Sequence, residues 1–245
     1  MQKNLLMRIF MEVFLVIPLY RPDVVSVEFL YHLRETLPLK MVVVNDGSGS
    51  EYQTLFERIA QIPDCMILNH SANLGKGRAL KTAFAYLTKN FPAAAGVVTC
   101  DGDGQHTIDD IERCYRVFQQ NPEKIILAVR DFTGKNIPWK SRLGNRISTF
   151  LFRKFTHLEL SDTQCGLRAL PMDFVKILPE KPGERFEFET IMLLESCNKA
   201  NGKVFDIEAL PIQTVYQINH RTNFRSLRDS YQIIKILLKN RQRSL

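Results

Sequence analysis

Two carboxylates one residue apart follow a short apolar run near the middle of the chain. Residues 97–99 have the β-branched character of a buried strand, and Asp101 and Asp103 come next, interleaved with glycines. Gln105 adds an amide oxygen two residues later. Carboxylate and amide oxygens suit Mg²⁺ or Mn²⁺, which usually share their coordination with substrate phosphates. The stretch therefore predicts a divalent-metal site at the carboxyl end of a strand, where open α/β sheets bind ligands.

Three other interpretations compete for the same residues. A solvated acidic turn without chemistry stays open. An EF-hand loop would use Asp101, Asp103, Asp109 and Glu112, but His106 stands where that loop needs glycine, and a strand precedes it instead of a helix. A phosphatase nucleophile at Asp101 would normally end the first strand of its domain, whereas three expected strands precede this one.

The expected strands alternate with amphipathic helical patterns at intervals of about 25–30 residues, which predicts a doubly wound, mostly parallel sheet with helices on both faces. The carboxyl ends of parallel strands meet at one edge of such a sheet. The polar residues that follow the expected strands should therefore gather there: Tyr20, Asp46, Asn73 with Lys76, Asp101 with Asp103, and Arg130. Carboxylates, a metal and basic side chains together match the needs of a nucleotide diphosphate.

The net charge of +7 is concentrated at the C-terminus. Residues 220–245 contain seven Lys or Arg and one Asp, and residues 226–240 form an amphipathic pattern. This asymmetry favours an anionic partner surface. A helix packed on the domain is the alternative for this segment. Nucleic acid is not expected, because no aromatic stacking platform accompanies the basic residues.

The cysteines and the N-terminus narrow the class of protein further. The five cysteines are an odd number and are widely spaced, which favours buried thiols in a reducing compartment over disulfides. The apolar run at residues 9–19 imitates a signal peptide, but Glu12 interrupts it and Pro18 ends it, so a first strand is expected there. No stretch reaches the roughly 18 apolar residues of a membrane span.

The order of several motifs resembles family 2 glycosyltransferases with the GT-A fold, most closely their dolichyl- or undecaprenyl-phosphate sugar transferases. The motifs are Ile17-Pro18-Leu19-Tyr20, Val44-Asn45-Asp46-Gly47-Ser48, Asn73-Leu74-Gly75-Lys76-Gly77, Asp101-Gly102-Asp103-Gly104-Gln105-His106, Ser141-Arg142-Leu143-Gly144-Asn145-Arg146 and Asp162-Thr163-Gln164-Cys165-Gly166-Leu167-Arg168. The resemblance covers nearly the whole chain. It divides the chain into a GT-A domain, residues 1–220, and a basic amphipathic C-terminal segment, residues 221–245.

The resemblance implies an inverting transfer of a hexose from a UDP- or GDP-sugar, dependent on Mg²⁺ or Mn²⁺. It implies that Pro18, Tyr20 and Asp46 line the nucleoside pocket, with Lys76 close by. It implies that Asp101, Asp103 and Gln105 hold the metal ion. It further implies that Arg130 and Arg142 face the acceptor phosphate or the diphosphate, and that Asp162 lies near the reacting carbon. It also suggests that an acidic residue of the expected core helix at residues 184–194 faces the acceptor. Pro22 and Asn45 depart from the family pattern, which leaves the identity of the donor open.

The expected acceptor is a polyprenyl phosphate. A sugar hydroxyl needs a general base, typically contributing about 10²–10⁴-fold, whereas a phosphate monoester is already anionic. The chain offers Arg130 and Arg142 but a single well-placed candidate base, Asp162. A saccharide hydroxyl is the first alternative, and a non-catalytic basic membrane-binding module is the second. The expected location is the cytoplasm, at the inner face of an anionic membrane, and a separate membrane protein is a further candidate partner.

Overall fold

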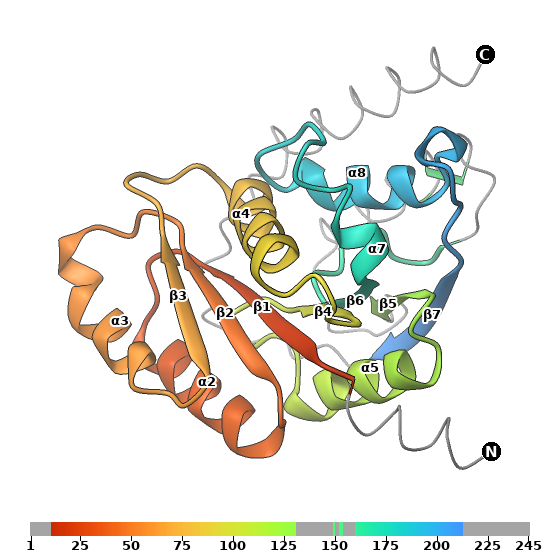
Figure 1. Cartoon of the computed structure of the whole chain (residues 1–245). Helices are drawn as coiled ribbons and strands as arrows, with labels where there is room; N and C mark the ends of the chain where they lie inside the picture. Colours follow the sequence, from red (N-terminus) through yellow and green to blue (C-terminus); the bar gives the residue numbers. More distant parts are fainter. Residues whose placement is uncertain (1–10, 131–148, 150–151, 154–159, 213–245) are drawn as a thin grey trace.

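A seven-stranded sheet forms the centre of the molecule, and helices cover both of its faces (Figure 1). The computed structural model describes residues 11–130, 149, 152–153 and 160–212. The strands are β1 (Val13–Leu19), β2 (Lys40–Asn45), β3 (Cys65–Asn69), β4 (Gly96–Thr99), β5 (Ile125–Arg130), β6 (Arg168–Pro171) and β7 (Ile207–Ile212). The helices are α2 (Val24–Thr36), α3 (Gln53–Ala60), α4 (Lys76–Asn90), α5 (Ile108–Gln120), α7 (Met172–Val175) and α8 (Glu187–Ser196), with short 3₁₀ turns η1 (Ser50–Tyr52) and η2 (Lys199–Asn201).

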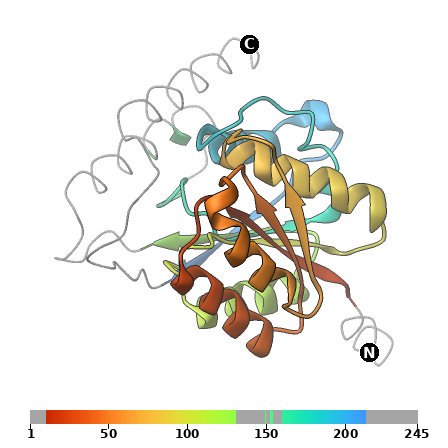
Figure 2. The same ribbon diagram turned by 90° about the vertical axis from the view of Figure 1, so that its left-hand side faces the viewer.

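Alternate residues of the central strand β1 pack into two separate hydrophobic cores. Leu15 and Ile17 face α2, α3 and α5, whereas Phe14 and Val16 face α4, α7 and α8. Successive side chains of a strand point to opposite faces, so a strand covered on both sides must be apolar throughout. Figure 2 shows the two layers, with α4 on one side of the sheet and α2 and α5 on the other. The predicted doubly wound sheet with helices on both faces is confirmed.

One strand of the sheet runs against the others. The strand order is β3-β2-β1-β4-β6-β5-β7, and β6 pairs antiparallel with both β4 and β5. Arg168, the first residue of β6, lies opposite Thr99, the last residue of β4. The segment before β6 therefore reaches the edge of the sheet where β4 and β5 end. This insertion brings Asp162 to the same edge as Asp101.

The edge strand β7 includes Pro211. Proline is tolerated there because β7 lies at the edge of the sheet formed by the described residues, where it pairs with β5 and needs no amide donor on its other side. The amphipathic pattern at residues 226–240 and the motif at residues 141–146 lie outside the described residues. Within the described ranges, no helix has the length and apolar character needed to cross a bilayer.

Candidate active site

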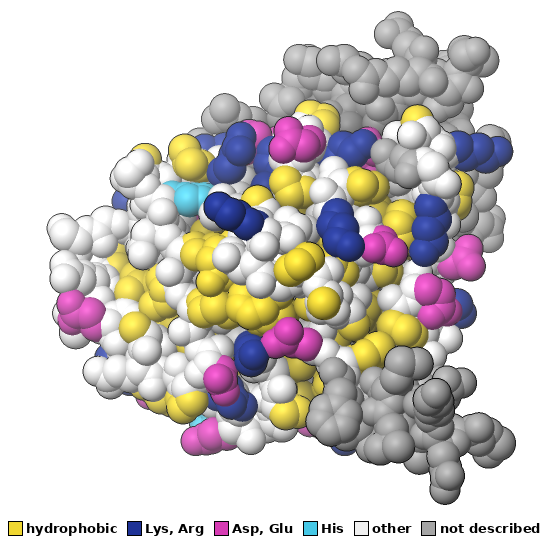
Figure 3. Space-filling view, viewed as in Figure 1, with side chains coloured by type: hydrophobic (Ala, Val, Ile, Leu, Met, Phe, Trp, Pro, Cys, Tyr) yellow, Lys and Arg dark blue, Asp and Glu magenta, His cyan; other side chains and the backbone are white. Residues whose placement is uncertain are grey.

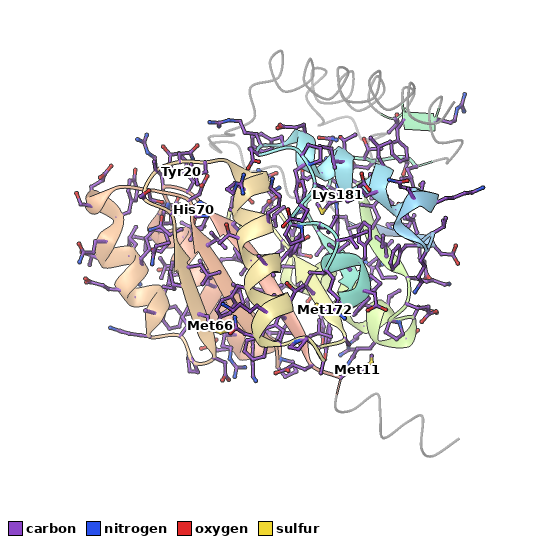
Figure 4. The ribbon with its side chains drawn as sticks, turned by 45° about the horizontal axis from the view of Figure 1, so that its top comes forward. Met11, Tyr20, Met66, His70, Met172 and Lys181 are labelled. Atoms are coloured by element: carbon purple, nitrogen blue, oxygen red, sulfur yellow. The ribbon has the colours of Figure 1, made fainter. Side chains whose placement is uncertain are left out.

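The predicted site residues in the described part of the chain line the edge of the sheet where β1, β2, β4 and β5 end. Figure 4 shows Tyr20, after β1, and His70, after β3, at this edge, while Met66 and Met172 lie toward the opposite edge. Pro18 and Tyr20 are half-buried, and the Arg21 guanidinium lies 5.1 Å from the Tyr20 ring centroid. Arg142 lies outside the described residues.

The turn after β4 presents Asp103 and Gln105 together. The Gln105 backbone N–H donates to Asp103 Oδ1 at 3.1 Å, and Gln105 Nε2 donates to Asp103 Oδ2 at 3.0 Å. Thr107 then caps α5, because its hydroxyl accepts the Asp110 N–H at 3.1 Å. The cap fixes where the helix begins and holds the acidic turn between two rigid elements.

Asp101 pairs with the Lys76 ammonium and lies beside His106. Lys76 Nζ, from the first turn of α4, is 2.6 Å from Asp101 Oδ1 and 2.7 Å from Glu189 Oε1 of α8. Burial disfavours the ammonium, but the two carboxylates outweigh it and raise the pKa of Lys76 above its ordinary value. Burial likewise disfavours the Asp101 carboxylate, yet Lys76, and then His106, hold the pKa of Asp101 far below its ordinary value. Both groups are therefore charged at neutral pH.

His106 completes the surroundings of Asp101. Its side chain is 5% exposed, and Nε2 lies 3.6 Å from Asp101 Oδ2, beyond hydrogen-bond distance. That nitrogen is buried and has no hydrogen-bond partner among the residues that the structure describes. On the other side of Asp101, Gly166 leaves room for the carboxylate, since a Cβ there would lie 2.6 Å from Asp101 Oδ2.

The Asp46 side chain is buried and accepts hydrogen bonds from the loop that follows β3. Asp46 Oδ1 accepts the Leu74 N–H at 2.9 Å and lies 2.8 Å from His70 Nδ1. Asp46 Oδ2 accepts the Gly75 N–H at 2.8 Å and Asn73 Nδ2 at 3.0 Å. These bonds tie the end of β2 to the loop that leads into α4, and thereby set the position of Lys76. The contact of Asp46 with a nucleoside stays a prediction.

Arg130 and Asp162 form a fork-like pair at the end of β5. Arg130 Nε donates to Asp162 Oδ2 at 2.6 Å, and Nη2 donates to Oδ1 at 3.2 Å. The Gln164 N–H adds a bond to Oδ1 at 2.9 Å, and the Asp162 side chain is fully buried. Such a two-pronged pair is strong and geometrically specific. It fixes the direction of the Asp162 carboxylate.

Arg168 is a buried cation that the sequence analysis did not assign to the site. Its guanidinium donates to the carbonyl oxygens of Thr163, Cys165 and Glu189 at 3.1, 2.9 and 2.7 Å. Burial lowers the pKa of Arg168 below its ordinary value. The side chain thus ties the segment that carries Asp162 to α8. The sequence signal that could have indicated this role is an arginine directly before an apolar run.

The partners of Glu189 and His106 were not predicted from the sequence. Glu189 lies in the helix from which an acidic residue was expected to face the acceptor, but its carboxylate pairs with Lys76 on the Asp101 side. His106 entered only as part of a motif, and its burial against Asp101 depends on how α5 packs. Pairs so far apart in the chain leave no local pattern in the sequence.

A basic rim lies beside this edge. Figure 3 shows Lys and Arg side chains over α4 and α8 on this face, with acidic side chains among them. Arg78 and Lys81 of α4 both bond to Glu184, and Lys181 pairs with Glu195 at 2.7 Å. Carboxylates neutralise these three cations. Arg78 and Lys81 fasten the segment before α8 to α4, and Lys181 fastens the same segment to α8.

The donor set at the end of β4 fits a divalent ion that shares its coordination with a phosphate ligand. Asp101, Asp103 and Gln105 offer hard oxygens, which Mg²⁺ and Mn²⁺ prefer. Within the described residues, no three His, Cys, Asp or Glu side chains are grouped so that they could hold a metal ion. Mg²⁺ usually binds through one or two carboxylates plus substrate phosphates and water, so two carboxylates suffice for this kind of site.

Solved structures share the fold. Glucosyl-3-phosphoglycerate synthase from Mycobacterium tuberculosis, in complex with Mn²⁺, UDP-glucose and phosphoglyceric acid, aligns with a TM-score of 0.71 over 98% of this chain and 83% of its own. The same enzyme in complex with Mg²⁺ and UDP gives a TM-score of 0.69. The identities are 13% and 15%, so this likeness concerns the fold alone.

Sequence relatives identify the family. UDP-N-acetylglucosamine–dolichyl-phosphate N-acetylglucosaminyltransferase of Methanococcus voltae is 24% identical over 83% of this chain and 86% of its own. An uncharacterized protein of Methanocaldococcus jannaschii is 27% identical over 86% of each chain. Residues 15–178 match the family described as glycosyl transferase family 2. Because this match spans more than half of the chain, the protein belongs to glycosyl transferase family 2.

Proposed function

We propose that this enzyme transfers a hexose from a UDP- or GDP-sugar to a polyprenyl phosphate, with inversion and with Mg²⁺ or Mn²⁺. The observation that carries the proposal is the pair between Arg130 and the buried Asp162. The pair engages Asp162, the candidate base for a hydroxyl acceptor, and so favours an acceptor that needs no base. The membership of a glycosyltransferase family argues against the non-catalytic membrane module.

The donor end rests on the residues that follow β4. Asp101, Asp103 and Gln105 would hold the ion, which when bound would neutralise charge on the leaving diphosphate. Lys76 lies beside Asp101 and adds a second positive charge within reach of the same place. Asp46 fixes the loop that carries Lys76 and so positions the donor side of the site.

The residues at the acceptor end favour a phosphate acceptor over a hydroxyl acceptor. A general base must have an oxygen available to accept the hydroxyl proton, whereas both Asp162 oxygens accept hydrogen bonds from Arg130 and one also accepts the Gln164 N–H. A phosphate monoester needs no base, but it does need cations that orient it. Arg130 and Arg142 are the proposed cations.

The relatives include both kinds of acceptor. The Methanococcus voltae relative is named for transfer to dolichyl phosphate, which favours the lipid phosphate. The mycobacterial structural neighbour is a glucosyl-3-phosphoglycerate synthase, and it keeps a soluble acceptor as the second candidate. A cytoplasmic position at the inner face of an anionic membrane, with or without a membrane protein partner, belongs to the first candidate.

A crossed substrate screen tests the proposal. Purified enzyme with Mn²⁺ is supplied with UDP- and GDP-sugars, and with either undecaprenyl phosphate or a soluble oligosaccharide. We expect transfer to the lipid phosphate only, dependent on detergent or lipid and lost with EDTA. R142A should raise the acceptor KM strongly, while D162N should lower kcat by less than the factor of about 10² that loss of a general base costs. Transfer to the oligosaccharide that D162N abolishes and R142A leaves intact would establish the hydroxyl acceptor instead.

A further inference from the structure

Lys76 pairs with one of the two carboxylate oxygens of Asp101 that a metal ion would use. Its ammonium is 2.6 Å from Asp101 Oδ1, and its side chain is only 15% exposed. The other oxygen, Oδ2, faces the buried His106 ring at 3.6 Å and the backbone of Gly166. In this state of the protein, the charge of Asp101 is balanced from within the chain.

Glu189 and the packing of α4 keep the ammonium in that position. Glu189 Oε1 accepts from Lys76 Nζ at 2.7 Å, and its side chain is 4% exposed. The backbone on either side of Lys76 is fixed as well: a Cβ at Gly75 would lie 2.4 Å from the Glu184 carbonyl oxygen, and one at Gly77 would lie 2.6 Å from Phe188 Cβ. The first turn of α4 thus sits directly on the segment that leads into α8. Only the flexible methylene chain of Lys76 can move.

We propose that Lys76 is a tethered cation that competes with the divalent ion for Asp101, so that metal binding depends on the nucleotide diphosphate. This inference rests on the proposed function. A divalent ion at Asp101 would lie close to the ammonium and be repelled by it. A diphosphate removes the conflict, because it offers oxygens to the metal and a new anionic partner to Lys76. Lys76 then couples the two ligands, and by linkage each tightens the binding of the other by the same factor.

Glu189 has a defined part in this coupling. It retains the ammonium beside Asp101 when no diphosphate is present, and it is too buried to serve as a surface ligand. Removing Lys76 alone would leave Glu189 as an unpaired buried carboxylate, which would destabilise the fold and also attract a metal ion by its charge. Removing both charges leaves the local net charge unchanged and takes away only the competitor.

The test compares Mn²⁺ binding to four full-length proteins: wild type, K76M, K76M/E189Q and K89M. Lys89 is an exposed lysine near the other end of α4 and serves as the matched control. Free Mn²⁺ is measured by electron paramagnetic resonance, alone and with saturating UDP or GDP, and circular dichroism checks the fold. We expect the diphosphate to tighten Mn²⁺ binding by about 5–150-fold in wild type and K89M, the usual range for coupled sites.

In K76M/E189Q we expect Mn²⁺ alone to bind at least 5-fold more tightly than in wild type, with most of the effect of the diphosphate lost. A merely structural role for Lys76 would weaken metal binding, so the direction of the change is decisive. If the wild type binds Mn²⁺ with a diphosphate, equal or weaker binding of Mn²⁺ alone in a folded K76M/E189Q overturns the inference. Loss of the proposed function looks different: no protein of the four would bind Mn²⁺ even with a diphosphate, and both proposals would then fall together.

Discussion

Asp101 and Asp103 follow the same strand, yet their surroundings differ in what a substitution would disturb. Asp101 is enclosed by Lys76, His106 and the Gly166 backbone. Asp103 is half-buried, and its side chain accepts hydrogen bonds from the neighbouring Gln105. We therefore expect substitution of Asp103 to affect activity with little effect on packing, whereas substitution of Asp101 should disturb both.

D103A should abolish most turnover while leaving the fold intact. Loss of a proposed metal ligand should cost more than the roughly 10–100-fold that loss of a supporting second-sphere group costs. The free energy of unfolding should change by no more than about 0.5 kcal/mol, as for ordinary surface substitutions. Turnover assays and urea unfolding check the two parts. Turnover that survives both D103A and EDTA would contradict a metal-dependent transfer.

D46N should destabilise the protein. Asparagine replaces one acceptor oxygen by a donor, which would then face the Gly75 N–H or the Leu74 N–H, both of which now donate to Asp46. Breaking a buried charged hydrogen-bond network costs about 2–4 kcal/mol. The midpoint of urea unfolding should fall accordingly, and nucleotide binding should weaken because the loop that carries Lys76 loses its anchor. An unchanged midpoint would show that the loop holds its shape without Asp46.

The pair between Lys76 and Asp101 should contribute a pH-independent stability around neutrality. The lowered pKa of Asp101 means that its contribution is complete above its unfolded-state value of about 3.9 and is lost as the pH falls toward the folded value. The raised pKa of Lys76 means that its contribution is complete below about 10.4 and is lost only at higher pH. The stability difference between wild type and K76M/E189Q should therefore be constant from pH 5 to 9 and shrink below pH 4. A step between pH 6 and 7 in thermal unfolding would contradict this.

At the scale of elements, the antiparallel strand β6 explains how the two halves of the site meet. Strand–helix alternation in the sequence predicts the parallel strands and hence the edge where Asp101 and Lys76 gather. It does not predict β6, because an arginine and three apolar residues after a polar turn leave no signal of partner or direction. The pairing between Arg130 and Asp162 depends on that strand, since β6 is inserted between β4 and β5.

G166A tests the segment before β6. A Cβ on Gly166 would lie 2.6 Å from Asp101 Oδ2, so the carboxylate or the segment must shift. We expect turnover and Mn²⁺ affinity to fall at least 10-fold, because Asp101 is held by Lys76 and has little freedom to move. G202A is the matched control: nothing lies within 4 Å of its Cβ, but φ is +78°, so it should cost stability and leave turnover intact. Full turnover in G166A would show that the carboxylate adapts.

At the scale of the whole molecule, the sequence predicts the layers better than the contacts between them. A continuously apolar strand such as β1 must be covered on both faces, which predicts a layer of helices on each side of the sheet. The partners of Glu189 and Arg168 follow from how α8 packs across the sheet edge, and packing of that kind is a property of the assembled fold. The charge distribution, in contrast, can be read from the sequence directly.

The uneven charge of the chain leads to a prediction about membrane binding. Replacing Lys235, Lys239, Arg241 and Arg243 by Gln lowers the net charge from +7 to +3 and removes positive charge only from the C-terminal segment, residues 221–245. Each basic residue near an anionic surface contributes about 1 kcal/mol, so binding to vesicles that contain phosphatidylserine should weaken by about 10²–10³-fold.

The matched control has the same net charge with the changes placed elsewhere. Gln replaces Lys89, Arg116, Lys176 and Lys199, which are all exposed on the described part of the protein. If the C-terminal segment carries the membrane contact, this control should bind anionic vesicles nearly as well as wild type, and raising the salt should weaken wild type and control alike, since exposed charges are screened over about 10 Å at 0.1 M. Neither variant touches the residues around Asp101, so Mn²⁺ and nucleotide binding should be unchanged in both. Equal loss of vesicle binding in the two variants would mean that overall charge, and no particular segment, draws the enzyme to the membrane.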